Sequence, residues 1–196
     1  MPLSIDRFDR RMLMLVAFTC FATGIRADAL SSAALERLAQ PGHVLLLRHA
    51  NAPGVGDPPG MDLSECSTQR NLDNAGRAHA KQLGVRLREA GIRRARIYTS
   101  QWCRCRETAR LLDLGEVHEL PPLNSTFGRP EQKESQIRAL REFIDTLPRN
   151  DLPVVLVTHQ ITITALTGDY PSSGDGLIVR LLPGGGFERV AESSTE

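Results

Sequence analysis

Residues 43–50 read HVLLLRHA, and residues 154–166 read VVLVTHQITITAL. Each stretch begins with a short apolar run and then changes at once to polar or charged residues. An uninterrupted apolar run of this length is typical of a strand that is buried on both faces of a parallel sheet. We therefore expect two central strands, 43–48 and 153–158, each followed directly by a histidine.

Helix-like and strand-like segments alternate on either side of these two stretches. Further strands are expected at 96–100, 116–120 and 176–182. Helices are expected at 30–40, 74–90, 103–112, 131–147 and 160–167. In the helix at 74–90, Leu83, Val85 and Leu87 are expected on the apolar side. The alternation predicts an α/β fold, a three-layer α/β/α sandwich with a mostly parallel central sheet and helices on both faces.

The first 29 residues are predicted to be a signal peptide that is removed from the mature protein. Three arginines precede the apolar segment 12–25, and Ala27-Asp28-Ala29 matches a small-residue cleavage pattern. The apolar segment is shorter than the about 20 residues that a membrane-spanning helix needs. We expect an exported protein, periplasmic or secreted, with residues 30–196 as one domain. An uncleaved N-terminal anchor is the alternative.

The mature chain carries 20 basic and 20 acidic residues. This balance does not favour nucleic acid or an anionic membrane as a partner. Three cysteines remain, Cys66, Cys103 and Cys105, and in an oxidising compartment one pair can form a disulfide. The sequence does not decide which pair forms. Their spacing matches no zinc or redox motif, so we expect a structural role and no metal site.

Arginines and histidines gather where the predicted strands end. Arg48-His49 follows the first strand, Arg104 lies just after the second, and His159 follows the most apolar one. Ligands of parallel sheets bind beyond the carboxyl ends of the strands. Guanidinium groups match phosphate oxygens, and a neutral imidazole can attack phosphorus through one nitrogen while a carbonyl holds the other. The pattern predicts a phosphate site.

Three segments resemble, in order, the signatures of the histidine phosphatase superfamily, also called phosphoglycerate mutase-like. LLLRHA resembles a strand ending in Arg-His-Gly, with Ala50 in place of the glycine. TSQWCRCRETA fits the pattern Ser-x-x-x-Arg-x-x-x-Thr-Ala, and VVLVTHQITITAL fits a strand followed by the second histidine. Arg70-Asn71-Leu72 also resembles the segment between the first two motifs. The resemblance covers about residues 43–182 and implies the phosphoglycerate mutase-like fold.

The resemblance implies a role for each matching residue. His49 would be the nucleophile, Arg48 and Arg104 would bind the transferring phosphoryl group, and His159 would complete the phosphate pocket. Water would then cleave the phosphohistidine on His49. The resemblance implies a small phosphorylated substrate and neither a metal nor an organic cofactor.

The proton donor to the leaving group does not carry over from the family. The two positions that hold a carboxylate in other members hold Ser125 and Gln160 here. We name Asp57 as the first candidate because it lies on the long loop, 50–68, that leaves the nucleophile strand. Other candidates are Asp62, Glu65, Glu131 and Glu134. A substrate with a good leaving group, such as a phosphoramidate or an acyl phosphate, needs less acid assistance.

The expected function is hydrolysis of phosphate monoesters or phosphoramidates without a metal, through a phosphohistidine on His49. A non-catalytic phosphate- or phosphosugar-binding module is the alternative, because the expected carboxylate is missing. A phosphomutase is a further alternative, which the predicted export disfavours. Substrate specificity is expected in the loops at 50–68 and 121–135, and the natural substrate and the oligomeric state stay open.

Overall fold

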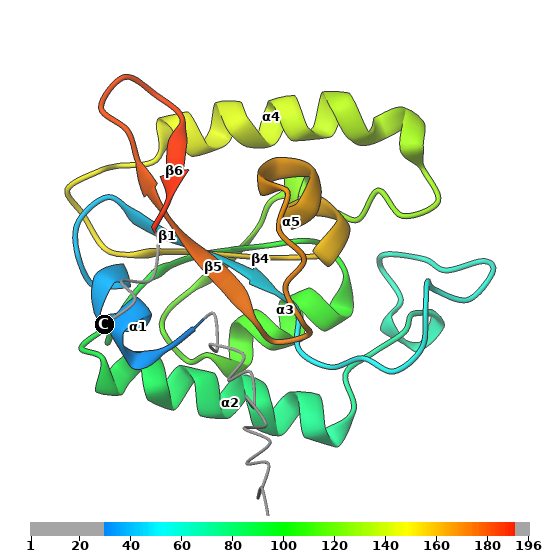
Figure 1. The fold of residues 1–196 in the computed structure, drawn as a ribbon. Helices are drawn as coiled ribbons and strands as arrows, with labels where there is room; N and C mark the ends of the chain where they lie inside the picture. The colour runs from blue at the N-terminus through cyan, green and yellow to red at the C-terminus, as the bar shows by residue number, and fades with distance from the viewer. Residues whose placement is uncertain (1–29, 191–196) are drawn as a thin grey trace, which may run out of the picture.

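The computed structural model of the chain describes residues 30–190. The predicted signal peptide, 1–29, lies outside the described residues. A six-stranded sheet crosses the molecule in the order β3-β2-β4-β1-β5-β6, with helices on both of its faces (Figure 1). The predicted α/β fold class is therefore confirmed.

Four strands of the sheet are parallel, β5 runs antiparallel to them, and β6 pairs antiparallel with β5. The strands are β1 (His43–Arg48), β2 (Arg96–Thr99), β3 (Val117–Glu119), β4 (Val154–Thr158), β5 (Gly176–Leu181) and β6 (Phe187–Arg189). The pairs β1–β4, β4–β2 and β2–β3 are parallel, whereas β1–β5 and β5–β6 are antiparallel. In β1 and β4, Arg48 lies opposite Thr158, so the two strands end at the same level of the sheet.

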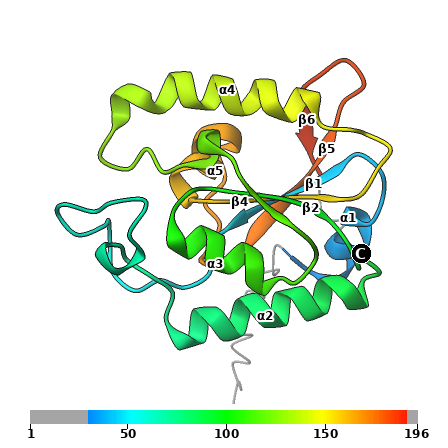
Figure 2. The same ribbon diagram turned by 180° about the vertical axis from the view of Figure 1, so that it is seen from behind.

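Helices cover the sheet in two layers. They are α1 (Ser32–Leu38), α2 (Asn74–Glu89), α3 (Cys103–Leu111), α4 (Lys133–Thr146) and α5 (Gln160–Thr167). From both sides of the molecule, α4 and α5 lie over one face, and α1, α2 and α3 lie over the other (Figures 1 and 2). Short 3-10 turns occur at Cys66–Thr68, Pro121–Leu123 and Pro130–Gln132.

The central strands contribute to a hydrophobic core on each face of the sheet. Leu45 and Leu47 of β1 belong to the cluster under α1, α2 and α3, whereas Val44 and Leu46 belong to the cluster under α4 and α5. Every residue of β4 is buried. Burial on both faces explains why these strands show unbroken apolar runs instead of alternation.

The buried face of α2 differs in part from the predicted one. Leu83 and Leu87 are buried as expected, but Val85 is 44% exposed. Gly76 and Gly84 lie on the buried side instead, where an added Cβ would collide with the backbone of Asn51 and of Leu112, respectively. The helix packs closely through these glycines, which a pattern based on apolar side chains does not reveal.

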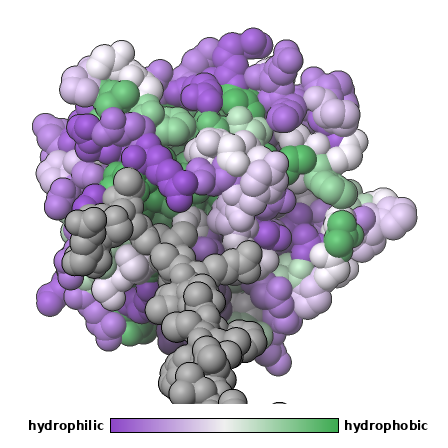
Figure 3. Space-filling view, viewed as in Figure 1, coloured by the Kyte–Doolittle hydropathy of each residue, from purple (hydrophilic) through white to green (hydrophobic). Residues whose placement is uncertain are grey.

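Within residues 30–190, few large apolar side chains are exposed. The face seen in Figure 3 is largely hydrophilic, with hydrophobic residues in small groups. Val55 and Phe127, which are 88% and 58% exposed, lie on the loops that follow β1 and β3. Within residues 30–190, no helix has the length and apolar character needed to cross a membrane.

Candidate active site

The paired ends of β1 and β4 place two histidines beside each other. The amide nitrogen of His49 donates to the carbonyl oxygen of Thr158 at 2.9 Å. The ring centres of His49 and His159 are 5.4 Å apart, with an angle of 68° between the ring planes. Residues far apart in the sequence thus meet because their strands are neighbours in a parallel pair.

A cavity of about 1050 Å³ opens at this edge of the sheet. Arg48, His49, Arg104 and His159 all line it. Three of them are almost fully buried, with exposed fractions of 3% for His49, 2% for Arg104 and 4% for His159. The structure therefore brings together all four residues that the sequence placed in one site, and their catalytic roles stay predictions.

His49 is held in the form that a nucleophile needs. Its Nδ1 lies 2.8 Å from the carbonyl oxygen of Ala50, which can only accept, so Nδ1 carries the hydrogen and Nε2 keeps its lone pair. Burial lowers the pKa of His49 to about 3; the charge of Arg104 also lowers it, while the bond to Ala50 opposes the shift. At neutral pH the imidazole is uncharged.

Both arginines of the site have a donor to spare. The Nε atoms of Arg48 and Arg104 are buried and have no hydrogen-bond partner among residues 30–190. Arg48 is anchored through Nη1, which donates to the carbonyl oxygen of Pro171 at 3.0 Å. A buried donor on a charged group is costly to leave unpaired. An oxyanion in the cavity is the partner whose chemistry fits both groups.

His159 is held by contacts with two residues that precede Arg104. Its Nε2 lies 2.8 Å from the hydroxyl of Ser100, and its ring packs edge-on against Trp102 with ring centres 5.2 Å apart. Burial and the neighbouring charges lower the pKa of His159 well below its ordinary value, so its ring is neutral. The Ser100 hydroxyl also contacts Asn124 at 3.2 Å, so the direction of that hydroxyl hydrogen selects which nitrogen of His159 is protonated.

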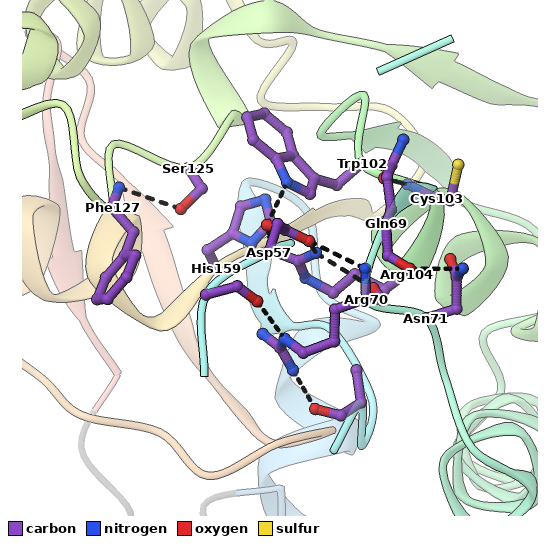
Figure 4. A network of polar contacts seen from close by, with 12 residues as sticks. Asp57, Gln69, Arg70, Asn71, Trp102, Cys103, Arg104, Ser125, Phe127 and His159 are labelled. Carbon is purple, nitrogen blue, oxygen red and sulfur yellow. Dashed lines mark hydrogen bonds and ion pairs between the residues drawn. The ribbon is translucent and has the colours of Figure 1, made fainter. Parts of the chain in front are cut away.

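Asp57 lies in the cavity as the partner of Arg104. Its two oxygens accept from Nη1 and Nη2 of Arg104 at 2.7 and 3.1 Å, and from the Trp102 indole at 3.0 Å (Figure 4). The amide nitrogen of Arg70 donates to the same carboxylate at 3.1 Å. Burial alone would raise the pKa of Asp57, but the bonds from Arg104 and Trp102 lower it below its ordinary value.

An ionised carboxylate that accepts these hydrogen bonds has no proton to give up. The arrangement therefore speaks against Asp57 as the general acid, and that role stays a prediction that requires the pair with Arg104 to open. Asp57 instead orients Arg104. It engages the two terminal nitrogens and leaves Nε, on the side of the guanidinium, for a ligand.

The other candidate donors are no better placed. Asp62 lines the cavity, but its carboxylate accepts from the amide and hydroxyl of Ser64 at 2.8 and 2.7 Å, which lower its pKa. Glu65, Glu131 and Glu134 are not among the residues that line the cavity. Among the five candidates, the two that line the cavity, Asp57 and Asp62, are thus both engaged by other residues.

A disulfide ties the cavity loop to the helix that carries Arg104. Cys66 and Cys103 are bonded, with their Cα atoms 5.7 Å apart, and Cys105 is a free, buried thiol. Cys103 is the first residue of α3 and immediately precedes Arg104. Burial raises the pKa of Cys105 to about 12, so this thiol stays protonated. The disulfide therefore holds the loop against the site.

Two further arginines of the cavity were given no role by the sequence. Arg70 holds the loop by donating to the carbonyl oxygens of Gly56, at 2.7 Å, and of Ala52. The resemblance of Arg70-Asn71-Leu72 to a family segment was a sequence signal that could have identified Arg70 as a site residue. Arg129 lies on a loop of the cavity wall, with its guanidinium carbon 5.3 Å from the centre of the Trp102 ring. No motif marks Arg129, because it lies in an irregular loop.

The donor set of the cavity suits an anion. Guanidinium groups and neutral imidazoles surround it, and such groups bind phosphate oxygens. Among residues 30–190, no three histidine, cysteine or carboxylate side chains are grouped so that they could hold a metal ion.

Solved structures of several phosphatases resemble this fold. The protein histidine phosphatase SixA complexed with tungstate is 18% identical, with 76% of this chain and 94% of that chain covered and a TM-score of 0.52. A mutant phosphoserine phosphatase from Entamoeba histolytica, in complex with phosphoserine, is 12% identical, with 79% and 98% covered and a TM-score of 0.54. At such identities the similarity shows a shared fold.

A third structure, the mycobacterial glucosyl-3-phosphoglycerate phosphatase with VO3, is 13% identical, with 78% of this chain and 99% of that chain covered and a TM-score of 0.56. Comparison with curated proteins gave no match. The sequence profile of the histidine phosphatase superfamily (branch 1) matches residues 44–141, half of the chain. This protein belongs to the histidine phosphatase superfamily, branch 1.

Proposed function

We propose that this protein is a phosphatase that transfers the phosphoryl group of its substrate to Nε2 of His49 and then to water. One observation carries the proposal. Arg48 and Arg104 line the same cavity as His49, and their buried Nε donors have no partner within residues 30–190. His49 is neutral, and its Nε2 keeps a lone pair for attack. The cavity thus combines donors for an anion with a nitrogen that can act as a nucleophile.

The first step forms a bond between Nε2 of His49 and phosphorus and breaks the bond from phosphorus to the leaving group. The carbonyl of Ala50 stabilises the hydrogen on Nδ1 as the ring becomes charged. Arg48 and Arg104 neutralise the charge on the non-bridging oxygens of the phosphoryl group. His159 donates to one of these oxygens through Nδ1, in the tautomer in which the Ser100 hydroxyl donates to its Nε2. In the second step, water attacks phosphorus, phosphate leaves, and His49 returns to its neutral form.

The state of Asp57 bears on the class of substrate. Because this carboxylate is ionised and paired with Arg104, it offers no proton to the leaving group in this arrangement. Substrates whose leaving group needs little acid help, such as phosphoramidates and acyl phosphates, are favoured over alkyl phosphate monoesters. Hydrolysis is expected to proceed without an added metal.

We further propose that the protein acts outside the cytoplasm. The disulfide between Cys66 and Cys103 supports this, because disulfides persist in oxidising compartments. The signal-like pattern of residues 1–29 points the same way.

The test is to incubate the purified protein with p-nitrophenyl phosphate and with a phosphoramidate, each in the presence of a metal chelator. We expect turnover of both, and slower turnover of an alkyl phosphate monoester, whose leaving group needs more acid help. A radiolabelled substrate, quenched in base during turnover, should leave label on wild-type protein and none on His49→Ala. Tight phosphate binding without any labelled protein or turnover would instead support the non-catalytic binding module.

A further inference from the structure

The cavity has room for far more than the phosphoryl group. Its volume of about 1050 Å³ lies at the upper end of ordinary small-molecule sites. Arg48, His49 and His159 line the part of the cavity at the strand ends, and loop residues that include Phe127 and Arg129 line another part, the loop wall. The part of a substrate that remains after the reaction would face that loop wall.

Arg129 is a cation on this wall that no carboxylate neutralises within residues 30–190. Its side chain makes one long hydrogen bond in that range, from Nη2 to the carbonyl oxygen of Ser125 at 3.4 Å. Its guanidinium packs over the Trp102 ring, which fixes the position of the charge. The two acidic residues of the cavity are already engaged, Asp57 by Arg104 and Asp62 by Ser64. No carboxylate of the described residues thus compensates the charge of Arg129, and most of its N–H donors are available to a ligand.

The Trp102 ring lies close to both this cation and Arg104 of the phosphoryl site. The guanidinium carbon of Arg104 lies 6.0 Å from the centre of the Trp102 ring, and that of Arg129 lies 5.3 Å from it. The two cations are therefore separated by less than twice the larger of these distances. One small molecule with two anionic groups can span such a gap.

We propose that Arg129 forms a second anion subsite, which binds a carboxylate or a second phosphate on the substrate. The inference rests on the proposed phosphatase function and narrows its substrate class. The substrate is a compact organic phosphate whose second anionic group is joined to the first through a few bonds. Phe127, 58% exposed on the same wall, offers apolar contact for the part that joins them. Arg129 thus determines specificity without touching the reacting phosphorus.

The experiment compares phenyl phosphate with 4-carboxyphenyl phosphate, which differ by one anionic group. The readout is the ratio of kcat/KM for the two substrates, measured in wild type, Arg129→Gln and Arg129→Lys. We expect a wild-type preference of about 10-fold for the carboxylated substrate, carried by KM, as is usual for one charge-assisted contact. Arg129→Gln should bring the ratio close to one, and Arg129→Lys should retain part of the preference.

The matched control is Arg141→Gln. Arg141 also packs over an aromatic ring, that of Phe187 at 5.6 Å, but it lies on α4 outside this cavity. Its substitution should leave the ratio as in wild type. A wild-type ratio near one, or a preference that survives in Arg129→Gln, would overturn the subsite.

A binding measurement separates this inference from the proposed function. Phenylphosphonate and 4-carboxyphenylphosphonate resist hydrolysis, and their affinities can be measured by calorimetry whether or not the protein is an enzyme. If wild type hydrolyses neither phenyl ester, nor p-nitrophenyl phosphate, nor the phosphoramidate, the phosphatase proposal fails. If such a protein still binds the carboxylated phosphonate more tightly, and Arg129→Gln loses that difference, the subsite stands. If wild type hydrolyses phenyl phosphate but shows no carboxylate preference in either assay, the phosphatase proposal stands while the subsite fails.

Discussion

The two sides of the cavity are built by different means. On one side, Arg48, His49 and His159 lie at the ends of β1 and β4, and the register of the parallel pair fixes where they lie. On the other side, the segments 50–73 and 121–132 contain no strand. Their position depends on a few specific ties, namely the Cys66–Cys103 disulfide, the Asp57–Arg104 ion pair and the backbone contacts of Arg70.

Under the proposed function, the strand ends carry out the chemistry and the loops select the substrate. The groups proposed to meet the reacting phosphorus lie at the ends of buried strands, where packing holds them. Groups that face the rest of the substrate lie on loops, which can change without disturbing the sheet. Asp57 connects the two sides of the cavity, because its carboxylate lies on the loop and orients the guanidinium of the buried Arg104.

The largest effect is expected at the strand end. His49→Ala removes the attacking nitrogen, and turnover of p-nitrophenyl phosphate should fall by about 10⁴-fold or more, as for other covalent nucleophiles. The control is His118→Ala, because His118 is exposed and lies outside the cavity. If His49→Ala keeps more than a small fraction of the wild-type kcat, the strand end does not carry the chemistry.

A smaller loss is expected from Arg104→Gln, which removes one of two guanidinium groups on the phosphoryl oxygens. The fall in kcat should be about 10²–10³-fold, comparable with loss of one oxyanion donor. Arg110→Gln, on the same helix and exposed, provides the control. Steady-state kinetics that show a change in KM alone would mean that Arg104 binds the substrate and the transition state equally well and does not stabilise the transition state selectively.

The loop side is tested by removing its covalent tie. The double variant Cys66→Ser/Cys103→Ser frees a loop that closes over 37 residues, and its free energy of unfolding should fall by about 2–4 kcal/mol. Urea denaturation measures the difference. A reductant should destabilise wild type and leave the double variant unchanged. Equal stability of the two proteins would mean that the loop side is held by its other contacts.

The contact between Asp57 on the loop side and Arg104 is tested with Asp57→Ala. Loss of the carboxylate leaves Arg104 poorly oriented, and kcat should fall by about 10-fold, which corresponds to about 1.4 kcal/mol in barrier height. In the double variant with Arg104→Gln, the second loss should largely disappear, because Asp57 acts through Arg104. A general acid would behave otherwise. Its removal would cost more with poor leaving groups than with good ones, in both Arg104 backgrounds.

The last prediction concerns the dependence of the free energy of unfolding on pH, which is small for each pH unit. The folded-state pKa of His49 is about 3, below the 6.5 of an unfolded histidine, so between these values the unfolded chain binds more protons. As the pH is lowered from 6.5 toward 3, His49 should therefore reduce stability by up to about 1.4 kcal/mol per pH unit. His159, whose pKa is also lowered, should add to the decline. His49→Gln should make the decline shallower. An unchanged slope in that variant would mean that His49 is not buried in its neutral form.

The strand side was predictable from the sequence and the loop side was not. The expected strand 43–48 matches β1 in full, and the expected strand 153–158 begins one residue before β4. A buried strand can be recognised from its own run of apolar residues, and His49 and His159 directly follow two such runs. The pairing of Asp57 with Arg104, and of Cys66 with Cys103, joins residues 47 and 37 positions apart through loop geometry that no local pattern encodes.

Gly76 shows how a position without any side chain can affect the geometry of the site. It supports the main chain at Asn51, two residues beyond His49, and even a methyl group there would displace that main chain. A larger residue at this position would therefore shift the main chain close to His49, the proposed nucleophile. We therefore expect a mutational scan for activity to single out position 76 in α2 as intolerant, while its exposed helical neighbours accept most residues.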